Sequence, residues 1–331
     1  MMCSRFRLLI AVIVSGGCLA AISTETLAQA YPTRPVRLVI AWAPGGPTDL
    51  LGRTVAQKLG ETFGEQVIVD NRPGAAGTIG AAAAANAAPD GYTLFLGASG
   101  MTIDQILYKS LPYDARKDFT PIGLVASGTT FLWVGASLPA RSLQELIALA
   151  KSKPGELSYG SAGNGSYPGH IGGELFKLKN GLDIIHVPYK GAAPAMIDAV
   201  AGRVSFVMTA GLAAAKPFLD SGKVRALAVT GDKRTAALPN VPTFAEAGSP
   251  LPEMNIGGWF GLLGPAGLPR NIVVKLNQSL AKAMVAPDVL ARLAVLSLDP
   301  MTSTPEAFSD LINTGIETWA PVLKRMNITL G

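Results

Sequence analysis

The chain has 331 residues, 49% of them hydrophobic, and its 28 Lys and Arg residues against 23 Asp and Glu residues give a formal net charge of +5. This charge is mild and its basic residues are scattered, a pattern that gives no support for nucleic-acid binding. After residue 30, no apolar run approaches the roughly 20 residues needed to cross a bilayer. At roughly 150 residues per domain, the length predicts two domains.

The first 30 residues have the form of a secretory signal. Arg5 and Arg7 precede the apolar run LLIAVIVSGGCLAAI, and the segment ends in LAQA before Tyr31. A basic start, a short apolar core and an Ala-x-Ala ending are typical of cleavable signals. We therefore expect cleavage after Ala30 and a periplasmic protein. The residues before Cys18 match a lipobox poorly, so we do not expect lipidation.

The first predicted unit is LVIAWAPGGPTDLLGRTVAQKL, residues 38–59, in which an apolar strand leads through a turn into an amphipathic helix. Gly45 and Gly46 have no Cβ, so another group can approach the backbone closely there. Thr48 or Asp49 is placed to cap the helix. Helix N-termini carry unpaired N–H groups and a partial positive charge. The turn is therefore either a tight connection or an anion site.

The same pattern recurs along the chain. A strand over 66–71 leads through RPGAAGTIG to an Ala-rich segment over 81–88, and PDGYTLFLGASGMTIDQILY repeats the unit with a turn over 97–100. A third repeat spans 157–178, and DIIHVPYKGAAPAMIDAVAGRVSFVMTAG has the pattern strand, helix, strand. Such alternation predicts βαβ units and a mostly parallel sheet. Ligands of such sheets lie beyond the carboxyl ends of the strands, where these glycine-rich turns are found.

Two segments are expected to cross between two domains. The first is DFTPIGLVASGTTFLWVGASLP, an apolar stretch interrupted by Ser127 and Gly128. The second is GGWFGLLGPAGLP, which follows a Pro-rich stretch. They predict a first part of domain 1 over 31–128, domain 2 over 129–252, and a return to domain 1 over 253–331.

Seven motifs together resemble one protein family. APGGPTD, DNRPGAAGTIG, PDGYTL, YGSAGNGSYPGH, VPYKG, VPTFAEAG and WFGLLGPAGLP occur in the order found in the Bug-type periplasmic solute-binding receptors of tripartite tricarboxylate transporters. The resemblance covers nearly the whole chain after residue 30. It implies an α/β fold of the periplasmic-binding-protein type (type II-like), with two domains closing on a small carboxylate in the cleft between them. It also implies no enzymatic activity, no cofactor, and the membrane subunits of a transporter as partners.

In the family, backbone amides, hydroxyls and waters from one turn of each domain hold the carboxylate; here the resemblance places these turns at 43–49 and 161–166. Opposed helix N-termini can hold an anion without a basic side chain. The candidate ligand-binding residues are Ala43, Pro44, Gly45, Gly46, Thr48, Asp49, Ser99, Ser161, Ala162, Gly163, Asn164, Ser166, His170, Tyr189 and Thr209. We expect Asp49 to act mainly as a helix cap, because an inward carboxylate would repel an anionic ligand.

A metal site is not favoured. His170 lies four residues before Glu174, a spacing that suits a metal, but His186 is the only other histidine and no third ligand is evident. We therefore expect His170 to make a hydrogen bond at the edge of the pocket. Both cysteines, Cys3 and Cys18, lie in the signal segment, so the mature chain is expected to have neither a disulfide nor a reactive thiol.

Enzyme motifs are also missing from the sequence. GASGM and GSAGN do not have the spacing of a Gly-x-Ser-x-Gly nucleophile elbow, and no Walker A sequence occurs. Two alternatives stay open. A sensor subunit would use the same fold with a different protein partner, and a secreted hydrolase, which we favour less, would have dispersed catalytic residues. We expect the receptor to be a monomer.

Overall fold

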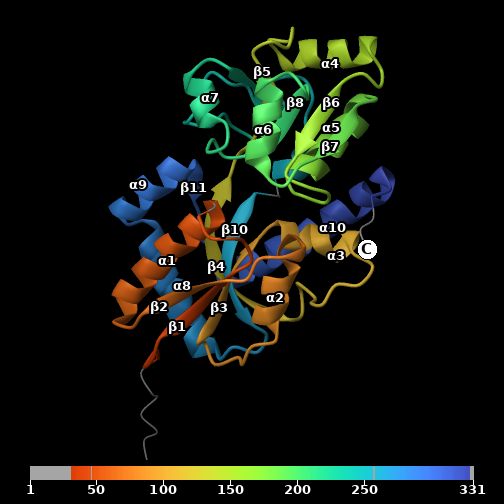
Figure 1. The fold of residues 1–331 in the computed structure, drawn as a ribbon. Helices are drawn as coiled ribbons and strands as arrows, with labels where there is room; N and C mark the ends of the chain where they lie inside the picture. The colour runs from red at the N-terminus through yellow and green to blue at the C-terminus, as the bar shows by residue number, and fades with distance from the viewer. Residues whose placement is uncertain (1–30, 46, 256–257, 329–331) are drawn as a thin grey trace, which may run out of the picture. The chain divides into compact units, whose positions relative to one another are not determined.

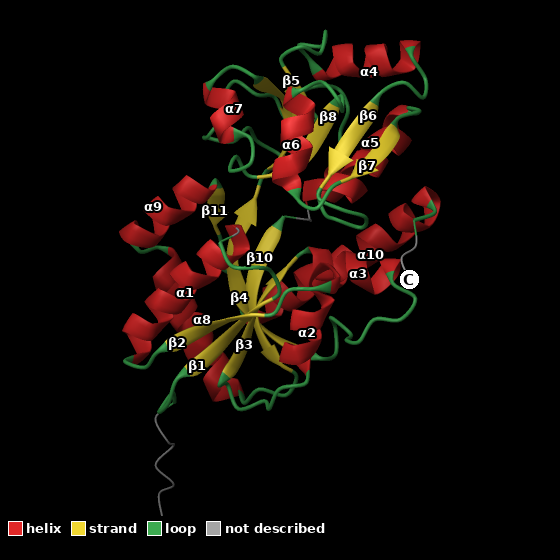
Figure 2. Cartoon of the chain, viewed as in Figure 1, coloured by secondary structure: helices red, strands yellow, loops and turns green. Residues whose placement is uncertain are grey.

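The computed structural model describes residues 31–45, 47–255 and 258–328, which form two β-sheets with their helices (Figures 1 and 2). The expected signal segment with its cleavage site and Gly46 lie outside the described residues. Both sheets lie in one compact unit of the chain, which begins at Arg34.

The first sheet has six strands. These are β1 (Val36–Ile40), β2 (Val67–Asn71), β3 (Thr93–Ala98), β4 (Phe119–Gly128), β10 (Trp259–Pro265) and β11 (Leu298–Pro300), in the spatial order β11-β4-β10-β3-β1-β2. Helices α1 (Pro47–Phe63), α8 (Arg270–Met284) and α9 (Pro287–Leu296) pack against one another beside this sheet. The short helix η1 (Ala75–Gly77), α2 (Thr78–Ala85), α3 (Gly100–Leu107) and α10 (Pro305–Met326) complete this set.

Successive side chains of β1 point to opposite faces of the sheet, and each face is covered by helices. Val39 belongs to a buried cluster that includes Ala81 of α2 and Phe308 of α10. Ile40 points the other way, toward α1, where Gly52 leaves room for its side chain. The apolar strand predicted from residue 38 is therefore buried on both faces, as strands between two helical layers are.

The second sheet has five strands. These are β5 (Thr130–Gly135), β6 (Ser158–Ser161), β7 (Ile185–Pro188), β8 (Phe206–Ala210) and β9 (Val224–Val229), in the spatial order β7-β6-β8-β5-β9. Its helices are α4 (Leu143–Ser152), α5 (Gly169–Asn180), α6 (Ala192–Val200) and α7 (Lys216–Asp220), and η2 (Pro252–Asn255) follows later in the chain. Trp133 packs with Met196 of α6, whereas Leu132 belongs to the cluster that contains Leu175 of α5.

The expectation of a mostly parallel sheet was wrong in one respect, because both sheets are mixed. β1 pairs in parallel with β2 and β3, and β6 pairs in parallel with β7 and β8. However, β10 runs antiparallel between β3 and β4, and β5 runs antiparallel between β8 and β9. The reversed strand β5 comes directly from the other sheet, separated from β4 by Thr129 alone. A strand that joins a sheet without a crossover helix need not run parallel to its neighbours.

The two connecting segments contact each other through their backbones. The Gly128 N–H donates a hydrogen bond of 2.6 Å to the Gly258 carbonyl. A Cβ on Gly258 would lie 2.5 Å from the Gly128 oxygen, so only glycine fits at this position without a backbone shift.

Candidate functional site

Strand register brings the predicted turns to one edge of each sheet. In the first sheet, Ile40 of β1 pairs with Asn71 of β2 and Leu96 of β3, so the turns that follow these strands lie at a common edge. In the second sheet, Ser161 of β6 pairs with Pro188 of β7, and β8 runs alongside in parallel. The carboxyl ends of neighbouring parallel strands are where ligands of such sheets bind.

The turn after β1 exposes its backbone. Ala43, Pro44 and Gly45 are all exposed, and Thr48, the second residue of α1, is half-buried. Gly45 has a φ of +84°, and a Cβ built on it would have no neighbour within 4 Å. Glycine is therefore needed at this position because the backbone has a positive φ, and not because neighbouring atoms would clash with a side chain.

The buried carboxylate of Asp49 holds this turn in place. The residue is 1% exposed. One carboxylate oxygen accepts hydrogen bonds of 2.9 Å from the Gly45 N–H and from Arg53 Nε, and the other accepts one of 2.9 Å from Asn71 Nδ2. Asn71 also donates to the Trp42 carbonyl at 3.0 Å. The carboxylate thus ties together the turn, α1 and β2.

The charge of Asp49 is balanced within the protein. The hydrogen bond from Arg53, followed by those from Gly45 and Asn71, lowers the pKa of the carboxyl to about 2, although burial alone would raise it. Asp49 is the third residue of α1, so it caps the turn by reaching back to a preceding N–H and not from the usual N-cap position.

Ser99 follows β3 at the same edge. It is buried, its N–H donates to the Trp259 carbonyl at 3.0 Å, and its own carbonyl accepts from the N–H and the hydroxyl of Thr102. Ser99 therefore joins β10 to the start of α3.

The turn after β6 is built on two serines. Ser161 is fully buried, and its Oγ lies 3.2 Å from the Gly163 nitrogen, 3.0 Å from the Gly163 oxygen and 2.7 Å from His186 Nε2. The Ser166 hydroxyl donates to the same Gly163 carbonyl at 2.7 Å. Ala162 and Asn164 are exposed at the surface of this turn. The serine hydroxyls fold the turn, and the residues between them face outward.

Two histidine rings lie stacked behind this turn. The rings of His170 and His186 are 4.0 Å apart at an interplanar angle of 15°, and the ring of Tyr159 lies 4.9 Å from that of His186 on β7. His170 Nδ1 accepts a hydrogen bond of 2.9 Å from the Gly165 N–H. His170 therefore binds the turn, and its expected hydrogen bond at the edge of a ligand pocket stays a prediction.

Burial keeps both imidazoles neutral. Desolvation lowers the pKa of His170, and it lowers the pKa of His186 to about 4, with repulsion from His170 as the second cause. Glu174, whose Oε1 accepts hydrogen bonds from the Tyr159 hydroxyl and from Lys177, is the nearby acidic group. At neutral pH the pair adds no charge to the turn.

Tyr189 directly follows β7, and Thr209 is the last residue but one of β8. The Tyr189 N–H donates to the Ser161 carbonyl at 2.9 Å, and its hydroxyl donates to Asp198 Oδ2 at 2.7 Å. Burial and the Asp198 carboxylate raise the pKa of Tyr189 to about 12. Thr209 Oγ1 accepts a hydrogen bond of 3.1 Å from Trp133 Nε1.

The hydrogen bonds thus connect the predicted residues in separate groups. Gly45 and Asp49 form one group, whereas a second group contains Ser161, Gly163, Ser166, Tyr189 and His170, whose N–H donates to the Ser166 carbonyl. Sequence reasoning missed the supporting partners Arg53, Asn71, Asp198, Trp133 and above all His186. Only the rarity of histidine in this chain marked His186, and nothing in its local sequence indicated Ser161 as its partner.

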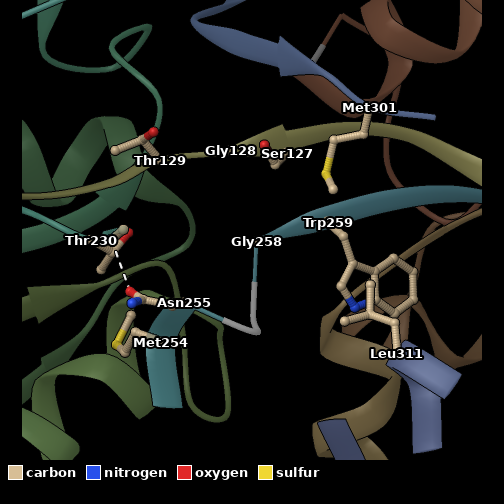
Figure 3. A pocket seen from close by; sticks show the side chains of 11 residues that line it. Ser127, Gly128, Thr129, Thr230, Met254, Asn255, Gly258, Trp259, Met301 and Leu311 are labelled. Carbon is tan, nitrogen blue, oxygen red and sulfur yellow. Dashed lines mark hydrogen bonds between the residues drawn. The ribbon is translucent and has the colours of Figure 1, made fainter. Parts of the chain in front are cut away.

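Figure 3 shows a pocket where the connecting segments run side by side. It is lined by Ser127, Gly128, Thr129, Thr230, Gly231, Met254, Asn255, Gly258, Trp259, Met301 and Leu311. The Gly231 N–H donates to Asn255 Oδ1 across it at 2.8 Å. The predicted site residues that the structure describes are not part of this lining, so the pocket belongs to the connecting strands and not to the turns.

Metal ligands are not gathered in the described ranges, where no group of three His, Cys, Asp or Glu side chains could hold an ion. Over the same residues, no helix is both long and apolar enough to cross a membrane.

Comparison with known proteins gives consistent matches. The model of the tripartite tricarboxylate transporter family receptor matches residues 51–328. Protein BugT of Bordetella pertussis is 35% identical over 320 residues, which cover 96% of each chain. A UPF0065 protein of Pseudomonas sp. strain P51 is 36% identical over 314 residues, covering 94% of this chain and 93% of the relative.

Solved structures agree with these sequence matches. The periplasmic binding protein BugD is 34% identical with a TM-score of 0.78, and the similarity covers 90% of this chain and 99% of BugD. A Rhodopseudomonas palustris protein solved with adipate is 38% identical with a TM-score of 0.79 over 90% of this chain and 99% of that chain. MatC from the same organism, with bound malate, is 33% identical with a TM-score of 0.77, and the similarity covers 88% of this chain and 100% of MatC.

Proposed function

Because the chain belongs to the tripartite tricarboxylate transporter receptor family, whose members are solute-binding receptors, we propose that it captures a small organic acid and delivers it to the membrane subunits of such a transporter. The acid is held through its carboxylate by the turns at 43–49 and 161–166. Relatives solved with adipate and with malate support a carboxylate ligand.

The observation that carries this proposal is the turn after β1. Its exposed Gly45 has open space beside it, and Asp49 fixes the turn while Arg53 neutralises the carboxylate. The first turn of α1, which begins at Pro47, offers N–H groups without an intrahelical acceptor beside this open space. Such groups favour a carboxylate without needing a basic side chain.

The proposed domains are 31–128 with 253–331, and 129–252. The first limit lies at Thr129, between β4 and β5, and the second lies within η2, shortly before the connecting segment that leads into β10. The ligand cleft would lie between these domains, and neither turn alone would satisfy the carboxylate. Binding would therefore favour the closed form, which the membrane partner recognises.

The family and its relatives are periplasmic binding proteins. We propose that the first 30 residues direct export and are removed after Ala30, and that the mature receptor acts as a monomer.

A thermal-shift screen tests the carboxylate ligand. Adipate, malate, acidic amino acids and aromatic acids are each added with the corresponding amide as the matched control. An acid at about 100 times its dissociation constant should stabilise the receptor by roughly 2.7 kcal/mol, whereas its amide should have little effect. Equal stabilisation by acid and amide would contradict recognition through the carboxylate.

Two variants extend this screen. Gly45→Val should abolish the shift in a folded protein, because valine is strained at a φ of +84° although no neighbour crowds it. Lys190→Ala, which removes an exposed charge next to Tyr189, should keep the shift. A lost shift in Lys190→Ala with an unchanged shift in Gly45→Val would mean that side-chain charge, and not the turn, holds the acid.

A further inference from the structure

A column of aromatic rings crosses the second sheet directly behind the turn at 161–166. Phe206 of β8 stacks on Tyr159 of β6 with centroids 5.3 Å apart, Tyr159 stacks on His186 of β7, and His186 stacks on His170 of α5. Three strands and one helix thus contribute one ring each. The column fixes where the two imidazoles lie relative to the sheet.

Each imidazole of this column makes one hydrogen bond to the turn. His186 Nε2 lies 2.7 Å from Ser161 Oγ at the start of the turn, and His170 Nδ1 accepts from the Gly165 N–H near its end. Ser161 Oγ in turn accepts from the Gly163 N–H. The two rings therefore hold both ends of a segment whose middle residues, Ala162 and Asn164, are exposed.

The bond from Gly165 requires a neutral His170 ring. Nδ1 of His170 can accept from Gly165 only when it carries no proton, so the proton of that ring is on Nε2. A cationic His170 would lose this bond and would oppose protonation of His186, whose ring lies 4.0 Å away. The charged groups that act on the pair are Glu174, which favours protonation, and Lys177, which opposes it.

We propose that His186 is a positioning residue of the ligand site, which holds Ser161 by its hydrogen bond and, together with the bond of His170 to Gly165, keeps the turn at 161–166 in its ligand-binding form. This inference rests on the proposed function in taking that turn as half of the site. His186 itself acts through its hydrogen bond to Ser161, and it need not touch the ligand.

The test compares two substitutions of the same residue. His186→Phe keeps a flat ring in the column but removes the hydrogen bond to Ser161, whereas His186→Gln keeps a polar atom near the position of Nε2. We expect the phenylalanine variant to shift the amide resonances of Gly163 and Gly165 in the ligand-free protein and to speed their hydrogen exchange at least tenfold. The glutamine variant should retain near wild-type values for both.

Binding provides the second readout. With whichever of adipate and malate binds the wild-type receptor, His186→Phe should raise the dissociation constant about tenfold, the effect of losing one hydrogen bond to a binding turn. His186→Gln should stay within about threefold of the wild type. If neither acid binds the wild type, the choice of ligand fails, but the amide resonances still decide the positioning role.

A control variant separates positioning from general stability. Ser249→Ala removes the two partly buried hydrogen bonds that the Ser249 hydroxyl makes with the Asn180 amide at the far end of α5. It should lower the melting temperature without moving the resonances of residues 161–166. Equal effects of Ser249→Ala and His186→Phe on those resonances, or equal effects of phenylalanine and glutamine at 186, would reduce His186 to a packing residue and overturn the proposal.

A measurement on the unsubstituted protein covers the case in which His186→Phe does not fold. The ring ¹⁵N spectrum at neutral pH should show His170 as a neutral imidazole with its proton on Nε2, and His186 as neutral. A proton on Nδ1 of His170 would exclude the bond from Gly165 and overturn the proposal.

Discussion

At the scale of single residues, buried polar side chains shape the backbone of the turns at 43–49 and 161–166 by binding neighbouring protein groups. Asp49 is bound to Gly45, Arg53 and Asn71, and Ser161 is bound to Gly163 and His186. Rigid turns of this kind present backbone groups at fixed positions. Such preorganisation lowers the ordering cost of binding a small ligand.

Asp49→Ala is expected to unfold the turn after β1. It leaves the Gly45 N–H and one N–H of the Asn71 amide without their acceptor, which should lower the free energy of unfolding by about 1–3 kcal/mol and abolish acid binding. Chemical denaturation and calorimetry would measure the two effects. Glu61→Gln, which weakens an exposed ion pair with Lys58 on the same helix, should cost less than about 1 kcal/mol and keep the affinity. A wild-type affinity in Asp49→Ala would show that the turn does not need this support.

The lowered pKa of His186 predicts a dependence of stability on pH. The unfolded chain takes up a proton at this histidine as the pH falls through 6.5, whereas the folded chain does so only near pH 4. Between these values the unfolded state binds more protons, so the contribution of His186 to stability decreases as the pH falls.

His186→Gln removes this contribution. The difference in melting temperature between the wild type and the variant should therefore move in favour of the variant as the pH falls from 7 to 5. Comparing two proteins cancels other groups, such as Asp104, whose pKa burial raises to about 7. A difference that is constant over this pH range would mean that His186 titrates normally in the folded protein.

At this scale the sequence predicted the turns but not their supports. Glycines, serines and a capping acid mark the turns within 38–59 and 157–178 locally, and the family resemblance placed the two ligand-binding turns at 43–49 and 161–166. Asn71 lies 22 residues from Asp49, and His186 lies 25 residues from Ser161. Only the pairing of β1 with β2 and of β6 with β7 brings them together, and such a pairing has no local sequence signature.

At the scale of elements, the reversed strands β5 and β10 explain why the alternation of strands and helices was an incomplete guide. The pattern identified β1, β3, β6 and the helices that follow them, because each is a local strand-turn-helix unit. It could not show that β10 inserts between β3 and β4, which precede it by more than 100 residues in the chain. The connecting segments that cause this insertion meet at Gly128 and Gly258.

Gly258→Ala tests how tightly these segments pack. The new Cβ would lie 2.5 Å from the Gly128 oxygen, so the backbones must separate, and we expect a loss of about 1–3 kcal/mol in the free energy of unfolding. Gly100→Ala, where nothing lies within 4 Å of the added atom, is the control and should cost nothing at the start of α3. Equal stabilities of the two variants, measured by urea denaturation, would show that the segments separate freely.

At the scale of the whole molecule, this member of a family of solute-binding receptors has two turns that each lie at the edge of a different sheet. The proposed function requires both turns on one carboxylate, so the proposed domains must approach each other when the acid binds. How far the population shifts depends on how much more tightly the closed form holds the acid than the open form does.

Small-angle scattering tests this claim most directly. The radius of gyration of the purified receptor is measured alone, with a saturating acid identified by the thermal-shift screen, and with the amide of that acid at the same concentration. We predict a smaller radius with the acid, and with the amide the radius of the ligand-free receptor. An unchanged radius at saturating acid would contradict closure of two turns on a carboxylate.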